Sequence, residues 1–324
     1  MRIAVVGSYG VGLTMRVARA PEAGETLTGG VFSSGHGGKG SNQAVAAARL
    51  GADVSLLTAV GRDAFGTDAR ELWHAEGVSC DHVVTADAST MVGVILVDHT
   101  GENRIAIAPG ALDRLSPADV DAFSDEIAAA DLLVTGFEIP VEVARRALLI
   151  ARRHGVRTLL NPAPAPAEPL DADLWSLVDV ITPNQTEAMR LTGESGLSSA
   201  EECAEAIRRR HAGVTIITLG GDGCLVDEPG REQAVIPAVS PRQVVDTTGA
   251  GDAFTGALAV ALARGDELRD AVRFAAAAGA HAVGIAEVVP GLPHPDDIAA
   301  LLALDPPPPL VEPVETHAST HPAP

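Results

Sequence analysis

The sequence has little cysteine, and its thiols form no recognisable pattern. Cys80, Cys203 and Cys224 are widely separated, odd in number and without metal-ligand spacing. This pattern disfavours both a disulfide framework and a zinc site. We therefore expect buried, reduced thiols in a cytoplasmic protein.

Long apolar runs are missing as well. No stretch of about 18 uncharged apolar residues forms a convincing membrane span. Met1 leads within two residues into the strand-like sequence IAVVG, without the apolar region and cleavage site of a signal peptide. The sequence thus predicts a soluble protein with no membrane partner.

Positive charge is scarce, since 23 Lys and Arg residues stand against 43 Asp and Glu residues, for a formal net charge of −20. A nucleic-acid partner is excluded because binding to it needs a basic surface. A polyanionic substrate would have to be held by local dipoles instead. At 324 residues the chain is long enough for one large α/β domain or two small ones.

The most informative stretch is VVDTTGAGDAFTGALAVALARG, residues 244–265. Gly249, Ala250 and Gly251 leave their backbone N–H groups open at the start of a helix expected to begin near Asp252. Such amides favour an anion by roughly 0.3–1 kcal/mol per contact. The positive end of the helix dipole should also keep the Asp252 carboxylate ionised. An ionised carboxylate can take a proton from an attacking hydroxyl. The alternative is that Asp252 is only a helix N-cap after an ordinary turn.

Most of the chain alternates between apolar strands and helices, which predicts a mostly parallel sheet with helices on both faces. Expected strands are 2–7, 53–60, 131–138, 156–161, 178–184 and 214–220, and expected helices are 65–76, 117–129, 141–154, 199–211, 266–284 and 294–304. Ligands bind such sheets beyond the carboxyl ends of the strands. Polar or glycine residues follow these ends at Glu138, Asn161, Asn184 and 220–223, which predicts a cleft there.

Two further segments are strand-like and interrupt this alternation. Residues 24–36 alternate β-formers with glycines, and residues 91–108 predict a hairpin with its turn at 99–103. Together they would form a small separate sheet that covers the cleft as a lid and supports a dimer. The proline-rich tail, residues 305–324, is expected to be disordered.

Between the strand-like segments lies HGGKGSNQAVAAARLGA, residues 36–52. Its glycines, Gly38 among them, allow close approach of a ligand, while Lys39 offers a charge and Asn42 an amide near a helix start. The segment lacks the upstream glycine and the Ser or Thr of a phosphate-binding P-loop. The alternative is a flexible hinge before a core helix.

The first strand is followed by glycines in the reverse of the dinucleotide-binding order. Gly7, Gly10 and Gly12 have the spacing G-x-x-G-x-G, and Pro21 and Gly24 lie where a helix should bind pyrophosphate. A dehydrogenase is therefore disfavoured.

Over about residues 1–304 the chain resembles the ribokinase family of carbohydrate kinases, the phosphofructokinase-B superfamily. Five motifs occur in the family's order: GGKGSNQA at 37–44, NPAPA at 161–165, TPNQTEA at 182–188, TLGGDG at 218–223 and DTTGAGDAF at 246–254. The resemblance implies one kinase domain with a ribokinase-like three-layer α/β/α fold and a small β lid, about 9–36 and 88–109. It also implies a homodimer through that lid.

The same resemblance implies transfer of the γ-phosphoryl group of ATP, with Mg²⁺, to a hydroxyl of a sugar or sugar-like alcohol. Asp252 would be the general base, and the amides of residues 249–251 the anion hole. Other matched positions imply sugar contacts (Gly38, Lys39, Asn42, Glu138), organisation of magnesium and phosphates through water (Asn184, Glu187), a nucleotide-binding loop (Thr218, Gly220, Gly223) and a K⁺ site (Asp246, Thr248).

Two departures from the family pattern bear on substrate and cation. Gly10 and Gly12 stand where the family carries Asn and Asp, and the loss of two polar partners costs about 1–3 kcal/mol each. Ribose itself is therefore in question, and the space would admit a bulkier group such as a nucleobase, or another sugar. Tyr9 is either a new contact or a packing residue. Glu287 replaces a usual glycine in the loop expected to bind potassium.

Two other functions are alternatives to a sugar kinase: a nucleoside kinase of the same fold, and a non-catalytic ligand-binding regulator. The regulator is disfavoured because it would not need Asp252, the Gly-Ala-Gly turn or the N-x-x-E motif.

Overall fold

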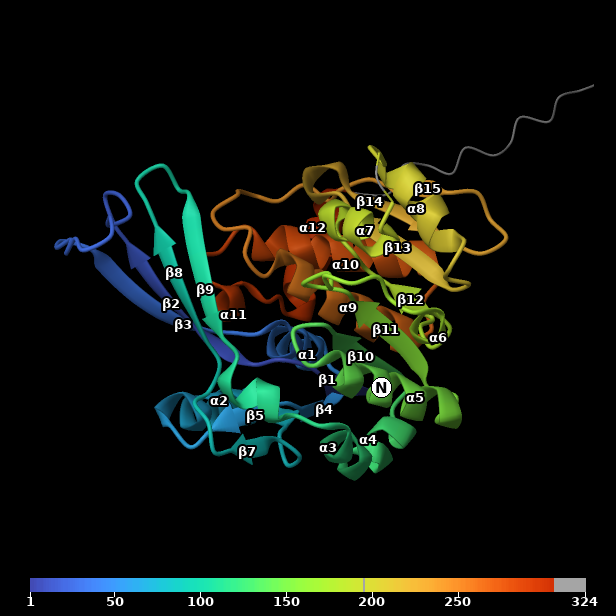
Figure 1. Cartoon of the computed structure of the whole chain (residues 1–324). Coiled ribbons are helices and arrows are strands. Elements are labelled where there is room, and N and C mark those ends of the chain that lie inside the picture. The colour runs from blue at the N-terminus through green and yellow to red at the C-terminus, as the bar shows by residue number, and fades with distance from the viewer. Residues whose placement is uncertain (195, 306–324) are drawn as a thin grey trace, which may run out of the picture.

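The computed structural model describes residues 1–194 and 196–305. A nine-stranded sheet lies between two layers of helices, and a smaller sheet projects from one side (Figure 1). This arrangement is the three-layer architecture that the alternating pattern predicts. Apart from residue 305, the expected disordered tail lies outside the described residues.

The large sheet is parallel except at one edge, and its strand order is β15-β14-β13-β12-β11-β10-β1-β4-β6. Its parallel strands are β1 (Arg2–Val6), β4 (Asp53–Leu57), β6 (Val78–Ser79), β10 (Leu132–Gly136), β11 (Arg157–Asn161), β12 (Val180–Ile181) and β13 (Val214–Thr218), and its antiparallel strands are β14 (Cys224–Asp227) and β15 (Ala234–Ile236). Because β1 pairs with both β4 and β10, strand order reverses there, and ligands bind at such switch points. The pattern missed β6, β14 and β15.

The large sheet has a hydrophobic core on each face, and its strands contribute side chains to both. In β1, Ile3 and Val5 belong to one core and Ala4 and Val6 to the other. One core is covered by α1 (Lys39–Arg49), α2 (Ala64–Ala75), α9 (Ala250–Arg264), α10 (Leu268–Ala282) and α12 (Pro295–Leu304). The other is covered by α3 (Pro117–Ala122), α4 (Ser124–Ala129), α5 (Val141–His154), α6 (Ala172–Trp175), α7 (Gln185–Thr192) and α8 (Ala200–Arg208). Burial on both faces explains the continuous apolar strands.

The helix expected over 117–129 is in fact two helices. They meet at Phe123, where the backbone leaves regular helical geometry (φ −94°, ψ 4°) and the ring is buried in the core. Burial of this ring therefore outweighs continuity of the helix.

Helix α9 is the buried centre of its layer, and it packs against α1 and α10. Its contact with α1 is close because Gly256 has no side chain: a Cβ there would lie 2.6 Å from the Cβ of Ala46. Gly249, in the left-handed region with φ 82°, caps the start of α9. The close contact brings the starts of α1 and α9 together at the carboxyl edge of the sheet.

The small sheet has the strand order β3-β2-β8-β9. Its strands are β2 (Gly10–Arg16), β3 (Val31–Gly37), β8 (Val92–Val97) and β9 (Asn103–Ala108). Three of the four strands fall in the two segments expected to form it, and residues 98–102 make the turn of the hairpin. The first segment begins as a strand only at Val31, and the strand pattern missed β2, although β2 lies within the lid range 9–36 implied by the family resemblance. A two-stranded sheet of β5 (Ala59–Gly61) and β7 (Val84–Ala86) lies elsewhere.

The three cysteines are free thiols. Cys203 and Cys224 are buried as expected, but Cys80 is only partly buried. Within the described residues, no helix is both long and apolar enough to cross a membrane.

Candidate active site

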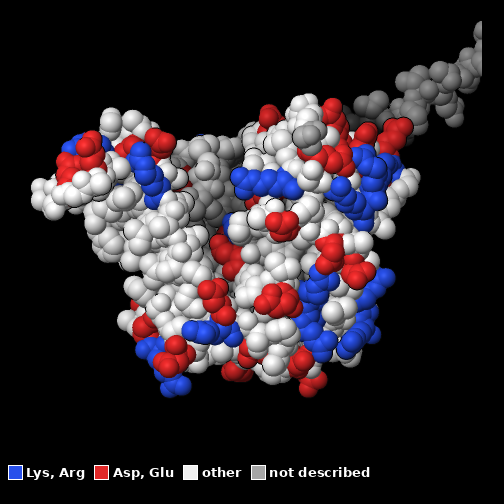
Figure 2. Space-filling model, in the orientation of Figure 1, with Lys and Arg blue, Asp and Glu red and all other residues white. Residues whose placement is uncertain are grey.

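A cleft of about 1000 Å³ opens at the carboxyl ends of the strands, beside the start of α9. Figure 2 shows this side of the molecule hollowed between the small sheet and the main layers, with acidic side chains in the hollow. Asn161, Asn184 and Gly220, expected at this edge, all line the cleft. Residues far apart in the sequence therefore meet at one site.

Asp252 is the third residue of α9, and its side chain does not cap the helix. Gly249 is the N-cap, so the N-cap interpretation of Asp252 is wrong, while the helix begins at Ala250, close to Asp252 as expected. Asp252 Oδ2 accepts a hydrogen bond from Asn42 Nδ2 at 2.7 Å, and Oδ1 accepts one from Gln43 Nε2 at 3.1 Å. The carboxylate is thus held across the contact between α9 and α1.

The environment of Asp252 makes it more basic than an ordinary aspartate. Burial raises its pKa, while the charge of Lys39 and the amide donors of Asn42 and Gln43 oppose the rise. Burial therefore works against the ionised state that was expected from the helix start alone. A carboxyl group whose pKa is raised toward neutrality accepts a proton more readily.

Lys39 lies in the cleft among three carboxylates. Burial alone would lower its pKa, but the charges of Asp252, Glu138 and Glu187 outweigh burial and raise the pKa. Lys39 therefore remains a cation at neutral pH. It is the positive charge with which this acidic chain can meet an anion in the cleft.

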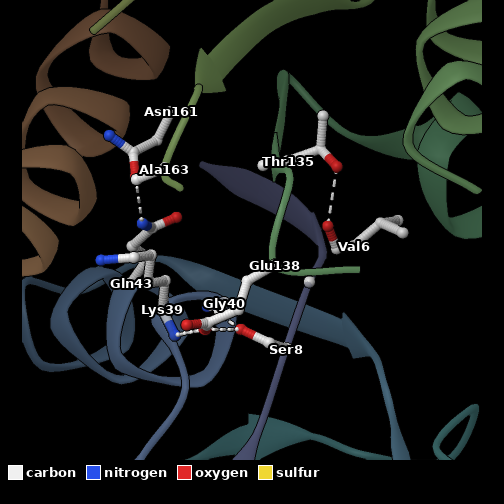
Figure 3. A pocket seen from close by; sticks show the side chains of 11 residues that line it. Val6, Ser8, Lys39, Gly40, Gln43, Thr135, Glu138, Asn161 and Ala163 are labelled. Atoms are coloured by element: carbon white, nitrogen blue, oxygen red, sulfur yellow. Dashed lines mark hydrogen bonds between the residues drawn. The ribbon is translucent and has the colours of Figure 1, made fainter. Parts of the chain in front are cut away.

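Glu138 anchors the loop that carries Lys39. Its Oε2 accepts hydrogen bonds from the Lys39 backbone N–H at 2.9 Å and from the Ser8 hydroxyl, and Figure 3 shows these groups converging. A hollow of about 10 Å³ beside them, also lined by Gln43 and Asn161, is at the lower limit for one water molecule. Glu138 thus fixes the backbone beneath the cleft.

Close packing explains the residues at positions 38 and 9, beside the start of α1. Gly38 has φ 87°, and a Cβ on it would lie 2.4 Å from the Tyr9 Cα, so only glycine fits. Tyr9 is fully buried, stacks edge-on against Trp73 and hydrogen-bonds through its hydroxyl to His36 Nδ1 at 2.8 Å. The packing interpretation of Tyr9 is right, and the idea that it contacts a ligand is wrong.

Gly10 and Gly12 differ in the space around them. A Cβ on Gly10 would lie 2.3 Å from Cε of Met91, so that side chain already fills the position. At Gly12 the nearest atom, Ile95 Cδ1, is 3.6 Å away. The expectation of released space is therefore wrong for Gly10, whereas at Gly12 a methyl group would fit in ordinary contact and space for a larger group stays a prediction.

Asn184 and Glu187 form a reciprocal cap at the start of α7. The Glu187 N–H donates to Asn184 Oδ1 at 2.8 Å, and the Asn184 N–H donates to Glu187 Oε2 at 2.9 Å. Burial raises the pKa of Glu187, although both residues line the cleft. A carboxylate that is disfavoured by desolvation gains most from a nearby cation.

The loop after β13 is shaped by glycine. Thr218 and Gly220 line the cleft, and Gly220 has φ 60°. Gly223 has φ 94°, and a Cβ on it would lie 2.1 Å from the carbonyl oxygen of Ile236. This loop therefore depends on glycine to bring its backbone against β15.

Asp246 and Thr248 meet at the turn before α9. The Thr248 N–H donates to Asp246 Oδ1 at 2.9 Å. Partial burial opposes the charge on Asp246, but hydrogen bonds from Thr248 and from the Glu287 N–H outweigh it and lower the pKa. The described residues contain no group of three or more His, Cys, Asp or Glu side chains able to hold a metal. A cation here would thus depend on backbone carbonyls.

Sequence reasoning did not select Gln43 or the apolar wall of the cleft. Gln43 contacts both Asp252 and Asn161, and its position beside Asn42 in the motif GGKGSNQA was the available signal. The wall includes Pro237, Val239, Val244, Phe254, Ala276, Gly279, Ala280 and Val283. Its residues come from an irregular segment and two helices, which no local pattern connects.

The fold has close counterparts among solved structures. The structure of Arabidopsis thaliana ribokinase complexed with ribose and ATP matches with a TM-score of 0.87 at 29% sequence identity, covering 93% of this chain and 98% of that one. This likeness confirms the predicted ribokinase-like three-layer α/β/α fold.

The chain belongs to the pfkB family of carbohydrate kinases, whose profile matches residues 2–294. The ribokinase of Schizosaccharomyces pombe is 40% identical over 307 residues, covering 90% of this chain and 96% of that protein. The deoxyribokinase of Salmonella typhi is 36% identical over 262 residues, covering 80% of this chain and 85% of its own length. The resemblance stated from the motifs is confirmed.

Proposed function

We propose that this protein transfers the γ-phosphoryl group of ATP to a hydroxyl of a sugar or sugar-like alcohol, with Asp252 as general base. The observation that carries the proposal is the Asp252 carboxylate, which lies in the first turn of α9 with a raised pKa. Gly249, Ala250 and Gly251 line the same cleft, and the Ala250 N–H donates a long hydrogen bond of 3.4 Å to the Thr247 carbonyl oxygen. Phosphoryl transfer requires positioning and charge stabilisation more than covalent chemistry, and this turn supplies both.

In the proposed reaction, the acceptor hydroxyl gives its proton to Asp252 while its oxygen attacks the γ-phosphorus, and ADP leaves. Asn42 and Gln43 hold the carboxylate in orientation through their hydrogen bonds. The amides at the start of α9 stabilise negative charge on the transferred group. Lys39 adds a fixed positive charge in the cleft.

The sugar would be held by Gly38, Lys39, Asn42 and Glu138. Asn42 Oδ1 is buried, and no atom of the described chain donates a hydrogen bond to it. Buried polar atoms are seldom left without partners, so this oxygen is suited to accept from a sugar hydroxyl. The names of the relatives, ribokinase and deoxyribokinase, support a pentose acceptor.

The nucleotide would occupy the larger part of the cleft. Thr218, Gly220 and Gly223 would contact its phosphates, and the apolar wall would enclose its base. Asn184 and Glu187 fit the task of organising Mg²⁺ through water, because Glu187 has a buried carboxylate that a cation would stabilise. Magnesium, when bound, neutralises charge on the phosphates. Asp246 and Thr248, with neighbouring carbonyls, are proposed to bind K⁺.

A nucleoside kinase is the second candidate, and the missing side chain at Gly12 favours it, since a Cβ there would meet no atom closer than 3.6 Å. A non-catalytic regulator has less support because the site retains a positioned, basic carboxylate beside an anion-binding helix start.

We also propose a cytoplasmic homodimer formed through the small sheet, which would act as a lid. Its exposed apolar side chains are Val31, Phe32, Val94, Ile105 and Ile107. An apolar surface of this kind on a projecting sheet is suited to a second copy of the chain. Sedimentation as a monomer at micromolar concentration would contradict the dimer.

The deciding experiment measures ADP release from ATP and Mg²⁺ across a panel of pentoses, hexoses, polyols and nucleosides. Asp252→Asn is the blank. Turnover on one compound or a small group supports the proposal and separates a sugar kinase from a nucleoside kinase. ATP binding without turnover on any member of the panel would contradict it.

A further inference from the structure

Glu287 has a backbone conformation that non-glycine residues seldom adopt. Its φ is 68° and its ψ is 156°, and it is the only non-glycine residue of the described chain with a positive φ. This region of backbone space is nearly restricted to glycine, and such outliers concentrate at functional sites. A glutamate kept at a glycine-like position points to a use for its side chain.

Packing of the next residue holds Glu287 against the catalytic turn. Glu287 is the N-cap of the short helix α11 (Val288–Gly291). The next residue, Val288, packs on the cap of α9, since a Cβ on Gly249 would lie 2.5 Å from Val288 Cγ1. Glu287 is therefore fixed next to the turn that carries the proposed anion hole.

The Glu287 side chain extends from this turn toward the small sheet. A Cβ built on Gly35 of β3 would lie 3.9 Å from Glu287 Oε2. Helix α11 (Val288–Gly291), which follows Glu287, packs against β3. The carboxylate thus reaches the face of the small sheet that looks toward α11.

The small sheet has no side chains of its own at this place. Gly35 on β3 pairs with Gly12 on β2, and Gly12 pairs with Gly93 on β8. Three glycines therefore form a row across three strands, and a Cβ on Gly12 would have Ile95 Cδ1 as its nearest neighbour. This glycine row offers a bound sugar no polar side chain.

The glycine row lies next to the proposed sugar-binding loop. From Gly35, β3 continues through Gly37, and Gly38 and Lys39 follow directly. A sugar held by Lys39 and Asn42 would therefore have one edge over the row. Buried hydroxyls on that edge need an acceptor, and Glu287 brings a carboxylate to it.

We propose that Glu287 determines substrate specificity by accepting hydrogen bonds from two adjacent hydroxyls of the sugar across the glycine row. A carboxylate has two oxygens and pairs naturally with a vicinal diol. The inference rests on the proposed function and narrows its substrate to compounds carrying such a diol, either free sugars or nucleosides. Deoxy analogues lack one of the two donors.

The test uses Glu287→Gly and Glu287→Gln with ribose, 2-deoxyribose, a ribonucleoside and its 2′-deoxy analogue. Glu287→Gly should raise the KM for the preferred diol about 10- to 100-fold, the effect of losing hydrogen bonds to a charged group, with the KM for ATP unchanged. It should also abolish the preference for the diol over its deoxy analogue. Glu287→Gln should give an intermediate loss. The pair of analogues that shows the preference identifies the source of the diol.

Folding provides an independent control. Glycine relieves the positive φ of residue 287, so Glu287→Gly should melt at the same temperature as the wild type or higher. A purely structural role would instead lower the Tm. Adding Gly12→Asp to Glu287→Gly should recover part of the diol preference by supplying a carboxylate from β2. Glu102→Gln, in the exposed turn between β8 and β9, removes an acidic charge from the tip of the small sheet and should leave all kinetic values unchanged.

The outcomes separate this inference from the proposed function. If Glu287→Gly turns over at the wild-type rate and keeps the preference for the diol, the role of Glu287 is overturned and the proposed function stands. In a second outcome, the wild type binds a diol in calorimetry without releasing ADP, and Glu287→Gly loses that binding. This result would support the role of Glu287 and overturn the kinase proposal. A wild type that binds no member of the panel would overturn both.

Discussion

Asn42 Nδ2 lies 2.7 Å from Asp252 Oδ2, although 210 positions separate the two residues in the chain. The contact exists because α1 and α9 pack closely through Gly256 and Ala46. It joins the glycine loop that would hold the sugar to the helix that would hold the phosphoryl group.

Asp252→Asn should reduce turnover about 10²- to 10⁴-fold, because an amide cannot accept the hydroxyl proton. ATP affinity should change little, since the amides of residues 249–251 remain. Steady-state ADP release and calorimetric ATP titration measure the two effects. Asp113→Asn, on the exposed surface, is the matched control and should behave as wild type. A near-normal rate in Asp252→Asn would identify a different base.

The pH profile of kcat/KM should report the basic character of Asp252. Activity needs the ionised carboxylate, so it should fall as pH falls through the pKa of this group. Because burial raises that pKa, the fall should begin at a higher pH than for an ordinary aspartate. Gln43→Leu removes a donor that favours the charged form and should move the acid limb to still higher pH. An acid limb at the same pH in Gln43→Leu as in the wild type would show that Gln43 does not influence the pKa of Asp252.

Gly256→Ala should destabilise the protein by about 1–3 kcal/mol and lower activity, because its methyl would meet Ala46 at 2.6 Å. The variant pushes α1 from α9 and disturbs the partners of Asp252. Denaturant unfolding and ADP release measure the two losses. Adding Ala46→Gly removes the opposing methyl and should recover part of both. A wild-type-like single variant would show that the helices yield without cost.

Gly10→Ala and Gly12→Ala form a matched pair on one strand. Gly10→Ala should cost about 1–3 kcal/mol of unfolding free energy, because Met91 occupies the position. Gly12→Ala should cost under about 0.5 kcal/mol, because its nearest neighbour is 3.6 Å away. Thermal or urea unfolding would distinguish them, and equal losses would contradict the difference in packing.

Potassium should stimulate turnover, and Asp246→Asn should weaken the stimulation. The lowered pKa of Asp246 keeps this group ionised down to acidic pH, so the effect should persist across the neutral range. Rates are compared in potassium chloride and in a large organic cation at equal ionic strength. Unchanged rates without potassium would reject the monovalent-cation site.

The architecture was largely predictable because its signals are local. Continuous apolar strands such as β1, β10, β11 and β13 predict a parallel sheet buried on both faces. Because ligands bind such sheets beyond the carboxyl ends of the strands, the position of the cleft follows. The short edge strands β6 and β15 lack a distinctive pattern. The small sheet was only partly predicted because its strand β2 follows β1 without a clear turn signal.

The place of Asp252 in the cleft was predictable because the residue belongs to a motif, and its role stays a prediction. The site was not predictable where packing decides the outcome. The sequence left Tyr9 as either a ligand contact or a packing residue, and its burial against Trp73 decides for packing. Gly10 was expected to release space, but Met91 fills the position. The role of Gln43 depends on how closely two helices approach, which no single segment encodes.

Only Gly38 separates the last residue of β3 from the first residue of α1. A connection of one residue leaves the two elements little freedom to move independently. It is also tightly packed, because a Cβ on Gly38 would lie 2.4 Å from the Tyr9 Cα. A tilt of the small sheet is therefore transmitted into the first turn of α1, where Asn42 and Gln43 hold Asp252. If the small sheet closes over a sugar as proposed, the same motion would also reposition the residues that hold the proposed base.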